Sequence, residues 1–155
     1  MLDKIIPLKL KYYLELIRFF NPIGFMLLMW PCWFAMTLIE IDFFNLIKWY
    51  ILLFIGAFLM RSAGCIINDL IDINIDKKID RTKNRPLTSK KISVLESVII
   101  LLLFLFLSLI ILFQFKFAAM LSGLLSLPFI ILYPFMKRYT YWPQIFLGIT
   151  FSWGV

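Results

Sequence analysis

Long stretches of uncharged, mostly apolar residues alternate with short charged segments along this chain. A helix that crosses the hydrocarbon core of a bilayer needs about 20 such residues. Five stretches approach or exceed that length, and we expect spans at approximately residues 19–39, 46–68, 95–115, 117–136 and 139–155. The pattern therefore predicts an all-α fold, a polytopic membrane helical bundle with about five transmembrane helices. The fifth stretch is barely long enough to span.

Basic residues gather in three of the segments that precede or separate these spans. Most of the 16 lie before the first span, between the second and third, or between the fourth and fifth, whereas the opposite connections hold only Lys48 and Lys116. Basic loops of membrane proteins face the cytoplasm. We therefore expect the N-terminus and the long loop after the second span to be cytoplasmic. We identify no signal peptide before the first span.

Composition narrows the functional classes. Hydrophobic residues make up 63% of the chain, against roughly 45–50% in a soluble domain, so a water-soluble globular enzyme is excluded. The net charge of +7 would suggest nucleic-acid binding in a soluble chain. Here basic loops and anionic headgroups account for it, and we expect no nucleic-acid partner. The absence of histidine excludes histidine metal sites, histidine general bases and Ser-His-Asp triads.

Acidic residues cluster where the second span ends. If the span continues as a helix, Asn68, Asp72 and Asp76 recur every fourth residue and form an oxygen-rich stripe about 12 Å long. Carboxylates crowded on one face repel each other unless a cation neutralises them. Mg²⁺ takes oxygen ligands, commonly one or two carboxylates together with substrate phosphates. The stripe, with Asp69 beside it, therefore indicates a Mg²⁺–diphosphate site.

Basic residues follow the acidic stripe directly, namely Arg81, Lys83 and Arg85. Guanidinium groups suit phosphate oxygens, so metal-binding carboxylates beside these cations would form a complete diphosphate cradle. The alternative is a solvated loop in which the acids pair with neighbouring basic residues.

Arg61 is a charged residue in the interior of the second span, seven residues before Asn68. An arginine at such a depth usually faces a polar cavity, although its guanidinium could instead extend to the membrane interface. We include Arg61 among the candidate substrate-binding residues.

The segment from Asn68 to Asp76 reads N-D-x-x-D-x-x-x-D and resembles the first aspartate-rich motif of the UbiA family of intramembrane aromatic prenyltransferases. Arg81 to Leu87 resembles the R-T-x-x-R-P-L segment of that family. Further matches occur at residues 18–24, 28–31, 133–140 and 143–148, so the resemblance covers nearly the whole chain. The pattern is most similar to the 4-hydroxybenzoate polyprenyltransferase branch of ubiquinone biosynthesis.

This resemblance implies a domain of about nine transmembrane helices whose central cavity holds a polyprenyl diphosphate. It implies transfer of the polyprenyl group to the ring of 4-hydroxybenzoate at a bacterial inner membrane, with Mg²⁺ as cofactor. Asn68, Asp72 and Asp76 would hold the metal, and Asp69 would be a further catalytic residue beside them.

The substrate-binding residues are implied in the same way. Arg18 and Asn21 would line the cavity near the aromatic acid. The implied phosphate-side cations are Arg81, Arg85, Lys137 and Arg138.

The family also has a second aspartate-rich motif, expected between its sixth and seventh spans, which these 155 residues do not include. We therefore interpret residues 1–155 as the N-terminal part of a single UbiA-like domain, and we expect no prenyl transfer from this polypeptide alone. The alternative is an inactive remnant, or a subunit completed by a separate chain that supplies the C-terminal half.

Two other classes of membrane protein are alternatives. A phosphotransferase of the CDP-alcohol type also uses aspartates on membrane helices, but its motif does not follow Asp69. A transporter would require residues 69–80 to lie within its transport pathway.

Overall fold

The computed structural model describes residues 7–139 and 142–153, and every regular element within them is an α-helix. The helices are α1 (Leu8–Leu16), α2 (Ile23–Thr37), α3 (Phe43–Asp76), α4 (Val94–Leu112), α5 (Phe117–Tyr139) and α6 (Pro143–Ser152). The predicted all-α class is confirmed. By length and hydropathy, α3 and α4 can each cross a membrane, whereas α2 is apolar but has only 15 residues.

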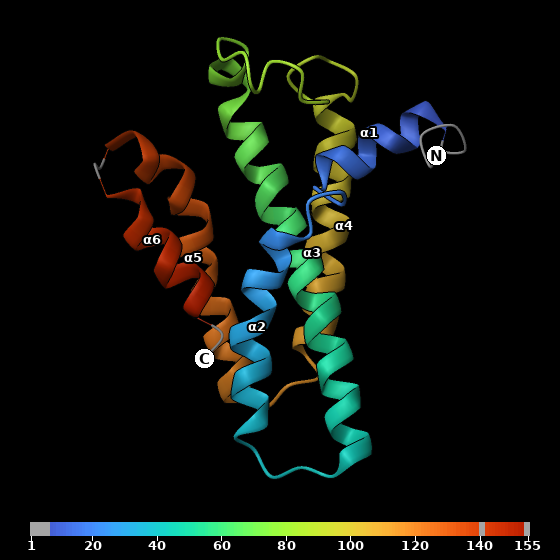
Figure 1. Cartoon of the computed structure of the whole chain (residues 1–155), viewed down its shortest axis with the longest axis vertical. Helices are drawn as coiled ribbons and strands as arrows, with labels where there is room; N and C mark the ends of the chain where they lie inside the picture. Colours follow the sequence, from blue (N-terminus) through green and yellow to red (C-terminus); the bar gives the residue numbers. More distant parts are fainter. Residues whose placement is uncertain (1–6, 140–141, 154–155) are drawn as a thin grey trace.

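The central element is α3, a single helix of 34 residues. It contacts α1, α2, α4 and α5, while α6 packs against α5 and α2 (Figure 1). Several of its buried residues are small, including Ala57, Ser62, Ala63 and Cys65. Small side chains allow neighbouring membrane helices to approach closely, so this composition suits a helix that is surrounded by others.

The helix limits differ from the expected spans at several ends, most of all in the fifth span, expected at residues 139–155, where α5 continues to Tyr139 and α6 runs from Pro143 to Ser152. Two further differences concern the first and second stretches. The second stretch was expected to end near residue 68, but α3 continues two turns further, through the acidic residues to Asp76. The first stretch was expected to begin at residue 19, but α2 begins only at Ile23, because the chain turns sharply after α1. Helix α1 was not expected, since nine residues of mixed polarity give no signal of a span.

The connections lie at two opposite ends of the bundle. Figure 1 shows α1, the loop between α3 and α4, the last turn of α5 and the first turn of α6 at one end, with the α2–α3 and α4–α5 connections at the other. The three segments that carry most of the basic residues therefore share one end. This grouping agrees with the arrangement that the basic residues predict.

A buried apolar cluster supports the end that carries the acidic residues. It consists of Leu16 from α1, Ile66 from α3, and Leu87 and Ile92 from the loop between α3 and α4. Each of these side chains is at most 3% exposed. The loop is thus anchored on α3 by apolar packing. This packing fixes the position of Arg85, which the loop carries.

A polar contact also ties α1 to the start of α4. Lys9 forms an ion pair with Glu96 at 2.6 Å, and the Tyr13 hydroxyl donates to the same carboxylate at 3.0 Å. Glu96 also accepts from the backbone N–H of Ser93, whose hydroxyl accepts from the N–H of Glu96, a capping box at the start of α4. The hydrogen bond that Lys9 donates to the Glu96 carboxylate raises the pKa of Lys9 above its usual value.

Candidate functional site

Arg18 stands at the sharp turn between α1 and α2. Its backbone N–H donates to the carbonyl of Glu15 at 3.1 Å, and that of Phe19 donates to the carbonyl of Leu14 at 2.9 Å. This pair of bonds is a Schellman motif, which places Arg18 in the left-handed region with φ = 59°. Glycine is the usual residue there because it has no Cβ. We therefore expect the Arg18 side chain to make a contact that offsets the strain of this conformation.

The Arg18 guanidinium reaches a buried carboxylate on α3. One of its nitrogens donates to both oxygens of Asp69, at 2.9 and 3.0 Å. Asp69 is only 1% exposed, so its charge requires a partner. The Ser62 hydroxyl donates to the carbonyl of Ile17 at 3.3 Å and holds the turn against α3.

Arg85, from the loop after α3, joins two of the aspartates. Its Nη1 lies 3.0 Å from Oδ1 of Asp69 and 2.6 Å from Oδ2 of Asp76. The result is a continuous ionic chain from Arg18 through Asp69 and Arg85 to Asp76. Through these contacts Asp69 links the turn after α1 to the loop after α3.

The predicted acidic stripe lies on a continuous helix, since α3 extends through Asp76. At about 100° per residue, Asn68, Asp72, Asp76 and Asp69 fall within one arc of about 100°. The four residues thus share one face, as their spacing predicted. Asn68 and Asp72 are half-buried, whereas Asp69 and Asp76 are buried.

The acidic face offers oxygen donors of the kind that Mg²⁺ binds in proteins. Among the described residues, no three acidic, histidine or cysteine side chains are close enough to enclose a metal ion. Mg²⁺ is usually held by one or two carboxylates, with substrate phosphates and water completing its shell. The amide oxygen of Asn68 and the carboxylates of Asp72 and Asp76 are suitable donors for such an open site, although Asp76 contacts Arg85 in this structure.

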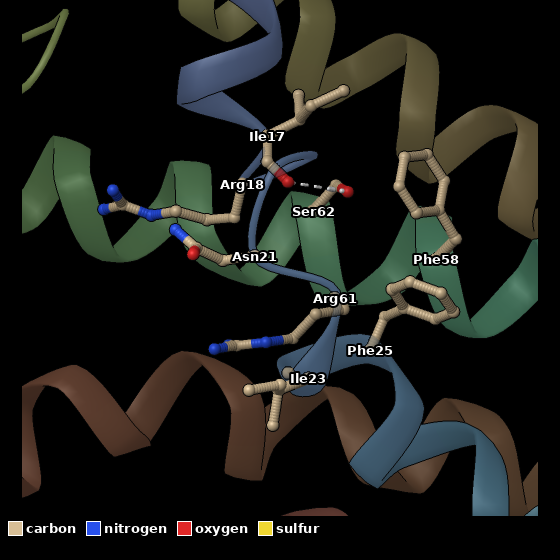
Figure 2. A pocket seen from close by; sticks show the side chains of 9 residues that line it. Ile17, Arg18, Asn21, Ile23, Phe25, Phe58, Arg61 and Ser62 are labelled. Carbon is tan, nitrogen blue, oxygen red and sulfur yellow. Dashed lines mark hydrogen bonds between the residues drawn. The ribbon is translucent and has the colours of Figure 1, made fainter.

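A cavity of about 170 Å³ adjoins the ionic chain. Its wall contains Arg18 and Asn21 from the turn before α2 and Arg61 from α3. Phe25 of α2 and Phe58 of α3 complete an apolar part, with their ring centroids 5.7 Å apart in an edge-to-face arrangement. Figure 2 shows the two arginines and Asn21 extending toward one side and the two phenylalanine rings on the other.

The charged side chains that line this cavity are all basic. The lining contains two arginines and an asparagine but no acidic residue. Arg61 therefore faces a polar cavity, as its position in the second span predicted. Such a cavity can accept a small anion that carries an aromatic ring, because guanidinium groups bind carboxylates and the phenylalanines contact the ring.

The other predicted cations lie in different settings. Arg81 is exposed on the loop after α3. Lys83 of the same loop forms an exposed ion pair with Asp80 at 2.7 Å. Lys137 and Arg138 belong to α5, but their side chains lie outside the part of the chain that the structure describes.

Four features of the site were not identified from the sequence. The pairing of Arg18 with Asp69 joins residues 51 positions apart, and Arg85 was assigned to phosphate rather than to the aspartates. Ser62, which holds the turn, carries no sequence signal. The phenylalanine lining was also missed, because Phe25 and Phe58 are two of 17 phenylalanines in an apolar chain.

Comparisons with known proteins support a single family. The model of the UbiA prenyltransferase family matches residues 28–155. The chain is 44% identical to a 4-hydroxybenzoate octaprenyltransferase of Marinomonas sp. (strain MWYL1), covering 95% of this chain and 51% of that protein. It is 43% identical to the mitochondrial 4-hydroxybenzoate polyprenyltransferase of Rattus norvegicus, covering 96% of this chain and 40% of that protein.

A solved structure shows the same arrangement of helices. It belongs to work on a digeranylgeranylglyceryl phosphate synthase in membranes, and it matches with a TM-score of 0.76 and 28% identity, covering 94% of this chain and 50% of that one. The chain therefore spans about half the length of the proteins it matches. The predicted polytopic membrane bundle is confirmed by this match together with the long apolar helices, and the protein is an integral membrane protein. On the match over residues 28–155, the chain belongs to the UbiA prenyltransferase family.

Proposed function

We propose that these residues form the acceptor pocket and the first diphosphate-binding segment of a 4-hydroxybenzoate polyprenyltransferase of ubiquinone biosynthesis. The reaction would transfer a polyprenyl group from a polyprenyl diphosphate to the ring of 4-hydroxybenzoate. The observation that carries this proposal is the cavity beside the acidic face, with its arginines on one side and its phenylalanines on the other.

The size of the cavity favours an acceptor with one ring. An apolar cavity of about 150 Å³ is sufficient to bind benzene, and this one measures about 170 Å³. Arg61 and Asn21 would bind the carboxylate of the acceptor, with Arg18 nearby, while Phe25 and Phe58 would contact its ring.

The acidic face would bind the second substrate. Asn68, Asp72 and Asp76 would hold Mg²⁺, which when bound supplies positive charge that stabilises the departing diphosphate. Arg81, Arg85, Lys137 and Arg138 would contact phosphate oxygens. Arg85 lies beside Asp76 at 2.6 Å, where the diphosphate is expected, and it would exchange this carboxylate for phosphate oxygens when the diphosphate binds.

The proposed chemistry is an electrophilic aromatic substitution. The bond between the first prenyl carbon and the diphosphate oxygen breaks, and the electron pair leaves with the diphosphate. A carbon–carbon bond forms at the ring position next to the hydroxyl, and that carbon then loses its proton to the released diphosphate. The residues of this chain contribute by orienting the ring and by balancing the charge of the leaving group.

Because the chain spans about half of its relatives, complete activity is proposed to require the remainder of the domain, for example from a separate chain. We further propose that the protein lies in a bacterial inner membrane, with the loop between α3 and α4 in the cytoplasm. An inactive remnant is the alternative, and the test below separates the two.

The test compares the chain alone with the chain co-expressed with a polypeptide that supplies the C-terminal half of a related domain. Both are assayed in membranes with Mg²⁺, a polyprenyl diphosphate and 4-hydroxybenzoate. We expect prenylated product only from the pair. Asp72→Asn should abolish it, because the change removes a charged metal ligand.

Asp80→Asn is the matched control. The Asp80 side chain is 97% exposed and forms an ion pair with Lys83 of the same loop, so its variant should retain the wild-type rate. Wild-type activity in the Asp72 variant would refute the assignment of the acidic face. Absence of product from the wild-type pair would favour the inactive remnant.

A further inference from the structure

Gly24 lies in the first turn of α2, directly against the side chain of Arg61. A Cβ atom added to Gly24 would lie 2.7 Å from Nε, 3.1 Å from Nη2 and 3.3 Å from Cζ of Arg61. A contact of 2.7 Å is closer than a carbon and a nitrogen can approach without displacement. Only glycine therefore allows the guanidinium to lie where this structure has it.

The backbone does not explain a glycine at this position. No glycine among the described residues has a positive φ, and alanine is a better helix former than glycine. Other glycines on this part of the fold behave differently, since a Cβ at Gly56 or Gly64 would meet its nearest neighbour at 3.7 or 3.9 Å, ordinary van der Waals contact. The requirement at residue 24 is thus for space, and Arg61 occupies that space.

The occupied space is part of the cavity. Gly24, Arg61, Arg18 and Asn21 all belong to its wall, and Figure 2 shows the Arg61 side chain passing the start of α2 on the same side as Arg18. A guanidinium beside the amino end of a helix experiences the positive end of the helix dipole. The guanidinium of Arg61 and the amino end of α2 would both attract a bound anion. This arrangement favours an anionic group at this point of the cavity.

We propose that Gly24 is a positioning residue for the acceptor: by lacking a side chain, it sets the direction of the Arg61 guanidinium toward the carboxylate of an aromatic acid. This inference rests on the proposed function for the identity of the ligand. A methyl group at residue 24 meets the far end of a flexible side chain rather than backbone. The Gly24→Ala variant therefore folds, but its Arg61 guanidinium moves away from the acceptor.

The first measurement needs no ligand. The 155-residue chain is prepared in lipid with ¹⁵N-labelled arginine, and the Nε–H signal of Arg61 is assigned by its loss in Arg61→Lys. Gly24→Ala should shift this signal, whereas Gly64→Ala should not. Gly123→Ala is a second control, because its Cβ would lie 2.8 Å from Leu112, an equally close contact in a different part of the fold. An unchanged Arg61 signal in Gly24→Ala overturns the inference.

The second measurement uses binding of 4-hydroxybenzoate and of 4-hydroxybenzamide, its uncharged analogue. Gly24→Ala should weaken binding of the acid about tenfold, the cost of losing one charge-assisted hydrogen bond, and change binding of the amide much less. In the Arg61→Ala background, Gly24→Ala should have no further effect on the acid. Equal weakening of both ligands, or an additive loss in the double variant, shows that the methyl group acts by filling the cavity and overturns the proposal.

The two measurements separate this inference from the proposed function. If the Arg61 signal shifts but the wild-type chain does not bind 4-hydroxybenzoate, the acceptor assignment fails while the contact between Gly24 and Arg61 stands. If the wild-type chain binds the acid and the Gly24 variant binds it equally well, the acceptor assignment stands and the positioning role is wrong.

Discussion

Arg18 and Lys90 share an unusual backbone conformation, with φ = 59° at both, but their side chains have different surroundings. Lys90 is exposed on the loop before α4. Arg18 instead pairs with Asp69, which is 1% exposed. A left-handed residue with a side chain costs about 1–2 kcal/mol. At Arg18 this cost is offset because the side chain pairs with the buried carboxylate of Asp69. Comparing substitutions at Arg18 and Lys90 therefore separates the effect of the ion pair from the effect of the backbone conformation.

We predict that glycine has opposite effects at these two positions. Lys90→Gly should stabilise the protein by about 0.5–1 kcal/mol, because relief of the left-handed strain exceeds the added chain entropy. Arg18→Gly should destabilise it by about 1–3 kcal/mol, because Asp69 keeps only Arg85 as a partner. The free energy of unfolding in mixed micelles measures both. Equal stability of the two variants would show that the ion pair contributes nothing.

At the scale of single elements, the first turn of α4 is held by polar contacts, although most of the helix is apolar. Its capping box uses Ser93 and Glu96, and the same glutamate binds Lys9 and Tyr13 of α1. The start of α4 is therefore also one of the points where α1 is attached. Substitutions here change two elements together.

Ser93→Ala should destabilise the first turn of α4 by about 1 kcal/mol, since the backbone N–H of Glu96 loses its acceptor. Hydrogen exchange at that amide should accelerate accordingly. Ser126→Ala is the control, because the Ser126 hydroxyl bonds within its own helix to the carbonyl of Gly123 and caps nothing. Unchanged exchange at Glu96 would contradict a role for the capping box.

At the scale of the whole molecule, the basic segments gather at one end of the bundle, around the acidic face and the loop that contributes Arg85 (Figure 1). The proposed diphosphate site lies at that end as well. The positive-inside rule assigns such an end to the cytoplasm. A water-soluble diphosphate headgroup could reach it from there while the prenyl chain remains in the bilayer.

Cysteine labelling tests this orientation in intact cells. In a chain without native cysteines, Lys116→Cys in the α4–α5 connection should react with a membrane-impermeant maleimide from outside. Lys83→Cys in the loop between α3 and α4 should react only after the membrane is permeabilised. The reverse pattern would place the acidic face outside and end the proposed cytoplasmic site.

The sequence was sufficient for the properties that depend on neighbouring residues. Hydropathy over about 20 residues predicted α3 and α4, the two described helices long and apolar enough to cross a membrane. The four-residue spacing from Asn68 to Asp76 predicted one face on a helix that does continue to Asp76. Helix limits were less certain, because hydropathy marks where apolar residues end and a helix can continue beyond them, as α3 does.

Only the tertiary structure decided which charges meet. Asp69 pairs with Arg18, 51 residues away, and with Arg85, 16 residues away, because the turn after α1 and the loop after α3 both fold back onto one end of α3. The space that Gly24 leaves for Arg61 likewise depends on how α2 crosses α3. Periodicity and composition describe a helix by itself. Ion pairs and cavities depend on the relative placement of helices, which is set by packing along their whole lengths.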